Sequence, residues 1–179
     1  LAALPAAAAR ADRQMDPELR GVIAEAITPA DCFEDKYEQA VWLAYMEPRL
    51  GRYVKDPGER EQILHHVHCE AKRAELPPEL VLAVMDVESR FDRYAVSSAG
   101  AVGLMQVMPF WPKELGMTNS QLVRVSDNIR MGTTILSYYL RKERGNYQRA
   151  LQRYNGSLGR PNYSDLVIDR LVSRWRYAH

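Results

Sequence analysis

The chain has 179 residues, enough for one compact domain with an extension and a sizeable hydrophobic core. Its 24 basic and 23 acidic side chains give a formal charge of +1, so composition offers no electrostatic case for nucleic acid as a partner. No run approaches the roughly 18 consecutive apolar residues of a transmembrane helix, so we expect a soluble globular protein without a membrane span.

Two features of the sequence bear on whether the protein is exported: its first residues and its cysteines. The chain opens LAALPAAAAR, where Ala7 and Ala9 before Arg10 have the small-x-small pattern of a signal-peptide cleavage region; an alanine-rich helix start is the alternative. Cys32 and Cys69 are the only cysteines. In an exported protein they are free to form one disulfide, whereas two buried thiols are the competing interpretation.

Apolar residues recur three and four apart along most of the chain, which is typical of amphipathic helices. The spacing predicts helices at 16–27, 34–47, 56–75, 78–88, 109–115, 126–140, 147–154 and 163–175. Asp56 is expected to cap the third of these, with Glu59 completing a capping box, and Ser126 is expected to cap the sixth.

Alternating strand patterns are not evident, and only residues 95–107 suit a short hairpin. The sequence therefore predicts an all-α fold. We expect an N-terminal helical extension over residues 1–56 and a main domain over 57–179, packed as one unit.

Glu88 stands out because it continues an apolar helical stripe through Val81 and Val84. Burial penalises the charged form of a carboxyl group, so the pKa of Glu88 should rise until the group can donate a proton near neutral pH. Asp86 lies near the opposite side of the helix, which argues against a tight pair of carboxylates. Two plainer interpretations stay open: a solvated charge at the helix end, or an ion pair with Arg90.

Three blocks follow one another in the sequence: Glu88-Ser89-Arg90-Phe91, the run GAVGLMQVMP over residues 100–109, and Tyr154-Asn155 after Ala150-Leu151. Asp127-Asn128-Ile129 and Gly132 lie between the last two. Together these blocks resemble the lytic transglycosylase domain of the soluble-lytic-transglycosylase type, in family 23 of the glycoside hydrolases. The resemblance covers residues 77 to about 156.

The resemblance implies a mostly helical, lysozyme-like fold with a groove for peptidoglycan glycan strands, in an exported protein of the bacterial periplasm or cell envelope. It implies that Glu88 is the single catalytic acid. Glu88 would protonate the oxygen between N-acetylmuramic acid and N-acetylglucosamine, and then accept the proton of the C6 hydroxyl to close a 1,6-anhydro ring. The substrate N-acetyl group would stabilise the positive centre, so no second carboxylate, metal or cofactor is implied.

The same resemblance assigns substrate-binding positions. Ser89 matches a serine that hydrogen-bonds substrate, Met105 and Gln106 match the segment lining the groove, and Tyr154 matches a tyrosine near the acid and the substrate acetamido group. Asn155 follows Tyr154 in the same block and is included among the substrate-binding positions. Each has a structural alternative, such as a helix-end hydroxyl, a core methionine or a packed aromatic ring.

Two features depart from the family pattern or compete with it. Arg153 precedes Tyr154 where alanine is common, and Gly156-Ser157 follow Asn155 where a small residue and then glycine are common. Part of the helix predicted at 56–75 has residues at a spacing that suits a metal: His65, His66, His68 and Cys69. No further ligand is evident, and we predict no metal site.

The alternatives to a lytic transglycosylase are a goose-type lysozyme, in which water captures the intermediate, and a non-catalytic glycan-binding or scaffold module.

Overall fold

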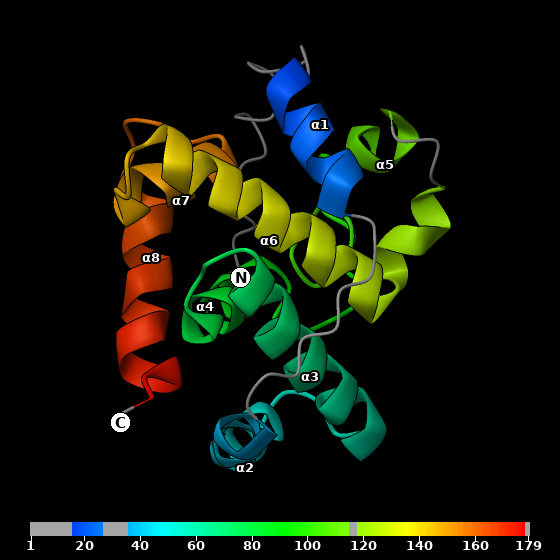
Figure 1. The fold of residues 1–179 in the computed structure, drawn as a ribbon, viewed down its shortest axis with the longest axis vertical. Helices are drawn as coiled ribbons and strands as arrows, with labels where there is room; N and C mark the ends of the chain where they lie inside the picture. Colours follow the sequence, from blue (N-terminus) through cyan, green and yellow to red (C-terminus); the bar gives the residue numbers. More distant parts are fainter. Residues whose placement is uncertain (1–15, 27–35, 115–117, 178–179) are drawn as a thin grey trace.

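The computed structural model describes residues 16–26, 36–114 and 118–177, and these are mostly helical (Figure 1). The α-helices are α1 (Pro17–Ala26), α2 (Lys36–Leu50), α3 (Pro57–Arg73), α4 (Pro78–Glu88), α5 (Phe110–Glu114), α6 (Val125–Lys142), α7 (Tyr147–Asn155) and α8 (Asn162–Arg170). A 3₁₀ helix, η2 (Asn119–Val123), precedes α6, and a π-helical turn, η3 (Leu171–Trp175), extends α8. The predicted all-α class is confirmed. None of these helices has the length and hydropathy needed to cross a bilayer.

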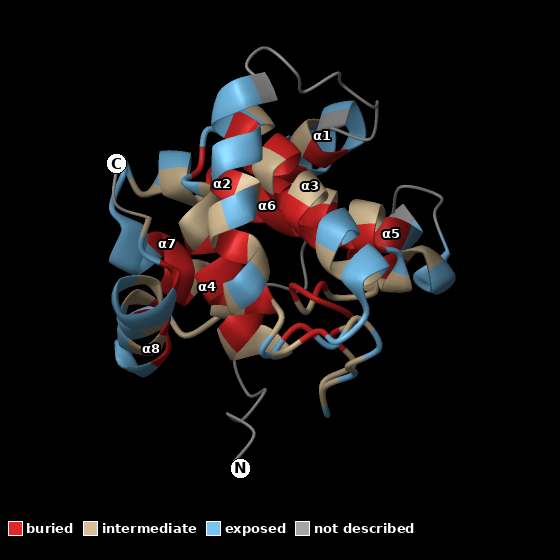
Figure 2. Ribbon diagram, turned by 90° about the horizontal axis from the view of Figure 1, so that it is seen from below, coloured by how far each residue is buried: buried red, intermediate tan, exposed pale blue. Residues whose placement is uncertain are grey.

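Helix α4 lies at the centre of the molecule and packs against α3, α8 and η3 (Figure 1). Its sequence is apolar nearly all round, and seven consecutive residues from Leu80 to Asp86 are buried. Helix α6 runs across α1, α3 and α7 and closes the other side of the core. In Figure 2 the buried surfaces of α3, α4 and α6 face the interior. A helix that is apolar on every side is suited to such a central position.

The predicted starts of α3 and α7 are confirmed, and at both a side chain caps the backbone. Asp56 Oδ2 accepts the Glu59 backbone N–H at 2.7 Å at the start of α3, and Asn146 Oδ1 accepts that of Arg149 at 3.0 Å at the start of α7. Each cap satisfies one of the donors that a helix leaves unpaired at its N-terminus. Gly156 then ends α7 in the left-handed conformation, with φ of 71°.

Two predicted helix boundaries are wrong, the end of α2 and the start of α6. Helix α2 continues through Pro48 to Leu50 instead of ending at residue 47. Proline loses the hydrogen bond to residue 44, but Leu50 is fully buried and the Arg49 guanidinium donates to the Tyr45 carbonyl at 2.8 Å, which holds the last turn.

Helix α6 begins at Val125, with Arg124 rather than Ser126 at its N-cap. Helix η2 ends where α6 begins, and Val125 is buried, so core packing sets the start of α6 in place of a capping hydroxyl.

The segment between α4 and α5 forms the hairpin-like loop expected over residues 95–107, but its pairing is limited to isolated bridges between Val96 and Val102 and between Val102 and Val107. Gly100 and Gly103 turn the chain with φ of 88° and 81°. At Gly103 an added Cβ would lie 2.6 Å from the Leu122 carbonyl oxygen, so the turn requires glycine on two counts.

Candidate active site

Glu88 is the last residue of α4, and the chain turns sharply just after it. Arg90 and Phe91 both have positive φ, 52° and 65°, which is unfavourable for residues with a side chain. Phe91 is nevertheless buried, with its ring centroid 5.1 Å from that of Tyr53 and 5.2 Å from that of Trp175. This aromatic packing stabilises the turn and so fixes where Glu88 sits at the helix end.

The Glu88 carboxyl group is poised to titrate near neutral pH. Burial raises its pKa from 4.5 to about 7, and a hydrogen bond from the Tyr163 hydroxyl to Oε1 at 2.6 Å opposes that rise. The residue as a whole is half-buried, so some of its surface remains accessible although the carboxyl lies among protein atoms. A carboxylic acid of this kind can give a proton to a leaving oxygen and take one back.

Tyr163 was not predicted as a site residue. It lies in the first turn of α8, is 2% exposed, and reaches Glu88 across 75 positions in the sequence. Burial and the nearby Glu88 raise its pKa well above 10, so the phenol stays protonated and remains a hydrogen-bond donor. Its helical spacing with Leu166 and Val167 indicates only a core aromatic, and no signal in the sequence reveals its hydroxyl partner.

Tyr154 lies on α7 and closes the site from a third part of the chain. Its hydroxyl donates to the Met105 carbonyl at 2.7 Å, and burial followed by the Glu88 charge raises its pKa well above 10. Asn155 is half-buried at the end of the same helix. Arg153, the departure from the family pattern, ion-pairs with Glu143, which also binds Arg149 at 2.5 Å. The Arg153 side chain is therefore engaged away from the site.

An amide side chain from α6 makes three hydrogen bonds that help to hold the residues around the Gly103 turn. Asn128 on α6 accepts the Met105 backbone N–H at 2.8 Å and donates to the carbonyls of Val102 and Leu122 at 2.9 and 2.8 Å. Because all three partners are backbone groups, Asn128 fixes the course of the loop rather than any one side chain. The loop in turn positions the carbonyl that Tyr154 contacts.

The other predicted substrate contacts are bonded within the protein. Ser89 Oγ donates to the Leu104 carbonyl at 2.8 Å. Gln106 has a positive φ of 52°, and its Nε2 donates to the carbonyls of Ala95 and Gly103 at 3.1 and 3.0 Å. The Met105 side chain is fully buried. These contacts give each residue a structural role, while its contact with substrate remains a prediction.

Two further sequence features are the pair of cysteines and the histidine-rich part of α3. Cys69 is buried on α3, and Cys32 lies outside the residues that the structure describes, so their pairing remains a prediction. The histidine-rich part of α3 belongs to no metal-binding group of three or more His, Cys, Asp or Glu within 16–26, 36–114 and 118–177.

Comparison with known families gives the site a context. The model of the family described as "Transglycosylase SLT domain" matches residues 66–164, which is more than half of the chain and includes Glu88, Tyr154 and Tyr163. The chain belongs to the Transglycosylase SLT domain family.

Relatives of this SLT domain carry corresponding names. It is 54% identical over 48 residues to the membrane-bound lytic murein transglycosylase C of Actinobacillus pleuropneumoniae serotype 5b, covering 27% of this chain and 13% of that protein. It is 36% identical over 88 residues to a transglycosylase of Enterobacteria phage PRD1, covering 49% of this chain and 32% of that one. The chain thus spans less than a third of the curated relatives it matches.

Among solved structures, the SLT domain resembles the lytic transglycosylase Slt of Pseudomonas aeruginosa, in a mutant that a glutamate-to-glutamine change makes inactive. The two superpose with a TM-score of 0.50 at 30% identity, over 60% of this chain and 20% of that one. This similarity confirms the expected lysozyme-like SLT fold.

Proposed function

We propose that the chain is a peptidoglycan lytic transglycosylase with Glu88 as its single acid and base. The observation that carries the proposal is the Glu88 carboxyl group, whose pKa is raised by burial to about 7 and which is held by Tyr163 at the end of a buried helix. Family membership and the names of the relatives support the same reaction. So does the Pseudomonas Slt chain, which a glutamate-to-glutamine change inactivates.

In the proposed reaction, protonated Glu88 gives its proton to the oxygen that joins N-acetylmuramic acid to N-acetylglucosamine, and the bond from that oxygen to C1 breaks. The muramic acid N-acetyl group stabilises the positive charge that develops at C1. The Glu88 carboxylate then takes the proton of the C6 hydroxyl, and O6 bonds to C1. The proton returns to Glu88 and no water is consumed, so one carboxyl group serves both steps.

The surrounding residues have distinct proposed roles. Tyr163 is a positioning residue: its hydroxyl holds Oε1 of Glu88 and stabilises the carboxylate left after the first proton transfer. Tyr154 is proposed to face the substrate acetamido group while its hydroxyl is held by the Met105 carbonyl. Ser89, Gln106 and Asn155 are proposed to contact the glycan strand along the same groove.

A second carboxylate is not needed for this reaction, in contrast to hydrolases that use a pair of them. Asp86, two residues before Glu88, accepts from Trp175 Nε1 at 3.1 Å and ion-pairs with Arg174 at 3.2 Å. These contacts engage Asp86 within the fold, which supports a mechanism built on Glu88 alone.

Product mass tests the proposal. Purified peptidoglycan digested with the chain should release muropeptides with 1,6-anhydro ends, each lighter by one water than a hydrolytic product. Products with only reducing ends would instead establish a goose-type lysozyme. Binding to glycan without any product would establish a non-catalytic module.

We also propose that the protein is exported and acts at the bacterial cell envelope, as the name of the membrane-bound relatives suggests for those proteins. A disulfide between Cys32 and Cys69 belongs to the same proposal. Protein isolated from an oxidising compartment and unfolded without reductant should then resist alkylation at both cysteines. Ready labelling of both would remove the disulfide from the proposal.

A further inference from the structure

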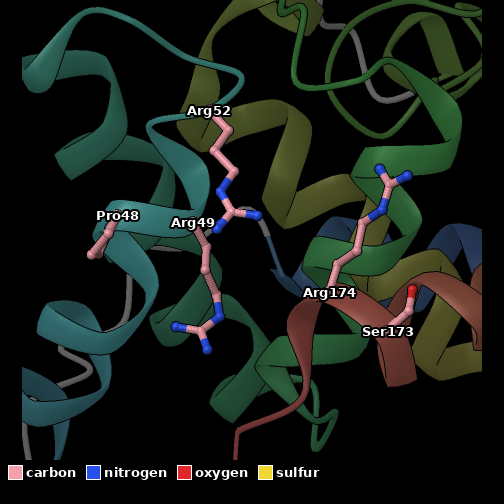
Figure 3. Close-up of a pocket in the computed structure, with 5 residues that line it drawn as sticks. All are labelled: Pro48, Arg49, Arg52, Ser173 and Arg174. Carbon is pink, nitrogen blue, oxygen red and sulfur yellow. The ribbon is translucent and has the colours of Figure 1, made fainter.

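A hollow of about 320 Å³ lies between the end of α2 and the turn η3. Its lining residues are Pro48, Arg49 and Arg52 on one side and Ser173 and Arg174 on the other (Figure 3). Glu88 and its contacts are not among them. A hollow of this size has room for a small polar group.

Positive charge is in excess around this hollow. Three of its five lining residues are arginines. Asp86 ion-pairs with one of them, Arg174, and has a side chain that is only 2% exposed. Glu47, the nearest acid along α2, is already paired with Arg60 at 2.6 Å. The hollow therefore carries two more positive than negative charges.

Two of the guanidinium groups are held in place by the fold. Arg174 donates to the Tyr53 hydroxyl at 2.6 Å and to Asp86, while Arg49 donates to the Tyr45 carbonyl and lies 3.7 Å from the centre of the Tyr45 ring. Positions fixed in this way reduce the conformational entropy that binding would otherwise cost. A planar guanidinium also matches the oxygen pairs of carboxylate and phosphate groups.

Arg52 completes the hollow without a partner of its own. Over residues 16–26, 36–114 and 118–177, its side chain has no hydrogen bond or ion pair, although it lines the hollow beside Arg49. Arg52 lies beside Arg49 and across the hollow from Arg174, and an arginine in this place without a partner in the described residues is suited to pairing with an anion from outside (Figure 3).

We propose that this hollow binds a doubly negative oxyanion group, either a phosphate or a pair of neighbouring carboxylates. Two sources share that chemistry: a small free anion, or the carboxylates of peptidoglycan stem peptides. The second source rests on the proposed function, whereas the site itself does not.

Titration of the full chain with inorganic phosphate and with succinate, at constant ionic strength and about pH 8, tests the site by calorimetry or NMR. We expect saturable binding of at least one of these dianions, with acetate much weaker. Arg52→Gln should weaken binding about tenfold, since a hydrogen bond to a charged group is lost. Arg144→Gln, which removes an exposed arginine between α6 and α7, is the matched control and should bind as the wild type.

Both variants should unfold at the wild-type temperature, because each arginine is exposed. No saturable binding of either dianion, or equal binding by Arg52→Gln and the wild type, would overturn the proposal.

A second measurement separates the two sources. The chain is assayed on intact peptidoglycan and on peptidoglycan freed of stem peptides by an amidase. If stem peptides are the ligand, Arg52→Gln raises KM on the intact polymer only; if a free anion is the ligand, KM is unchanged on both. If the chain cleaves neither polymer, the proposed function fails, while the phosphate and succinate titrations still decide the site.

Discussion

Asp86 and Glu88 lie two residues apart on α4 and have opposite surroundings. Asp86 is buried and receives hydrogen bonds from Tyr53, Arg174 and Trp175. Glu88 has the Tyr163 hydroxyl, and burial raises its pKa to about 7. The two carboxylates thus differ in their donors: Asp86 has three of them and joins α4 to η3, whereas Glu88 has one within the described residues, and its pKa is raised.

The difference follows from the helical repeat. A separation of two residues corresponds to a rotation of about 200° around the helix axis, so Asp86 and Glu88 face different neighbours. Asp86 faces the side of α4 covered by the aromatic and basic residues of η3, whereas Glu88 faces the start of α8. Within one helix, Asp86 is thus expected to stabilise the fold and Glu88 to carry the proposed chemistry. The following substitutions and measurements test this difference.

Glu88→Gln should have the largest effect. It keeps the size of the side chain and a hydrogen bond to Tyr163 but removes the proton, so release of muropeptides should fall by about a thousandfold. The assay is product formation from purified peptidoglycan, with circular dichroism to verify folding. Cleavage at the wild-type rate would remove Glu88 from the mechanism.

Asp86→Ala should destabilise the fold by about 3 kcal/mol, because it leaves Trp175 Nε1 and the Tyr53 hydroxyl without their acceptor and Arg174 without its ion pair. Urea unfolding measures the change. Asp169→Ala is the control: that residue is exposed and pairs with Arg170 at the surface, so the loss should be within about 0.5 kcal/mol. Equal losses in the two variants would contradict the structural role of Asp86.

The pH dependence of stability should reveal Glu88 directly. Its folded-state pKa of about 7 lies above the ordinary value of 4.5, so the folded protein binds more protons than the unfolded chain between these values. The contribution of Glu88 to stability is therefore full below about pH 4.5, and about 3 kcal/mol of it is lost as pH rises to about 7. Subtracting the urea-unfolding curve of Glu88→Gln at each pH isolates this contribution. A difference that does not change with pH would refute the raised pKa.

Tyr163→Phe should have a smaller effect, lowering kcat about tenfold. The lost hydrogen bond favours the carboxylate form, so its removal should raise the pKa of Glu88 further and shift the pH–rate profile to higher pH. Tyr147→Phe changes an exposed tyrosine of α7 and serves as the matched control. A reduced rate with an unmoved pH profile would show that the Tyr163 hydroxyl does not act through the pKa of Glu88.

The helices were largely predictable from the sequence because their signals are local. Apolar spacing and the caps at Asp56 and Asn146 act within one or two turns, and the predicted order of helices is observed. The errors arose where burial overrides a local signal: buried Leu50 anchors α2 beyond Pro48, and buried Val125 starts α6 before Ser126.

The site was predictable in part. The raised pKa of Glu88 could be expected because its place in an apolar stripe is a local pattern, whereas its proposed catalytic role rests on the resemblance of the three sequence blocks. Tyr163 was not predictable, since its contact with Glu88 spans 75 positions and depends on how α8 packs on α4. The burial of Met105 likewise follows from a tertiary contact, with Gly132 of α6.

That contact links a residue remote from the chemistry to the shape of the site. A Cβ at position 132 would lie 2.7 Å from Cβ of Met105 and 2.5 Å from its sulfur, so no larger residue fits without moving the loop. The Met105 carbonyl is also the acceptor for Tyr154. The missing side chain of Gly132 therefore sets how closely α6 approaches the loop. A methyl group added at position 132 would displace Met105 and, through the Met105 carbonyl oxygen, disturb the hydrogen bond from Tyr154.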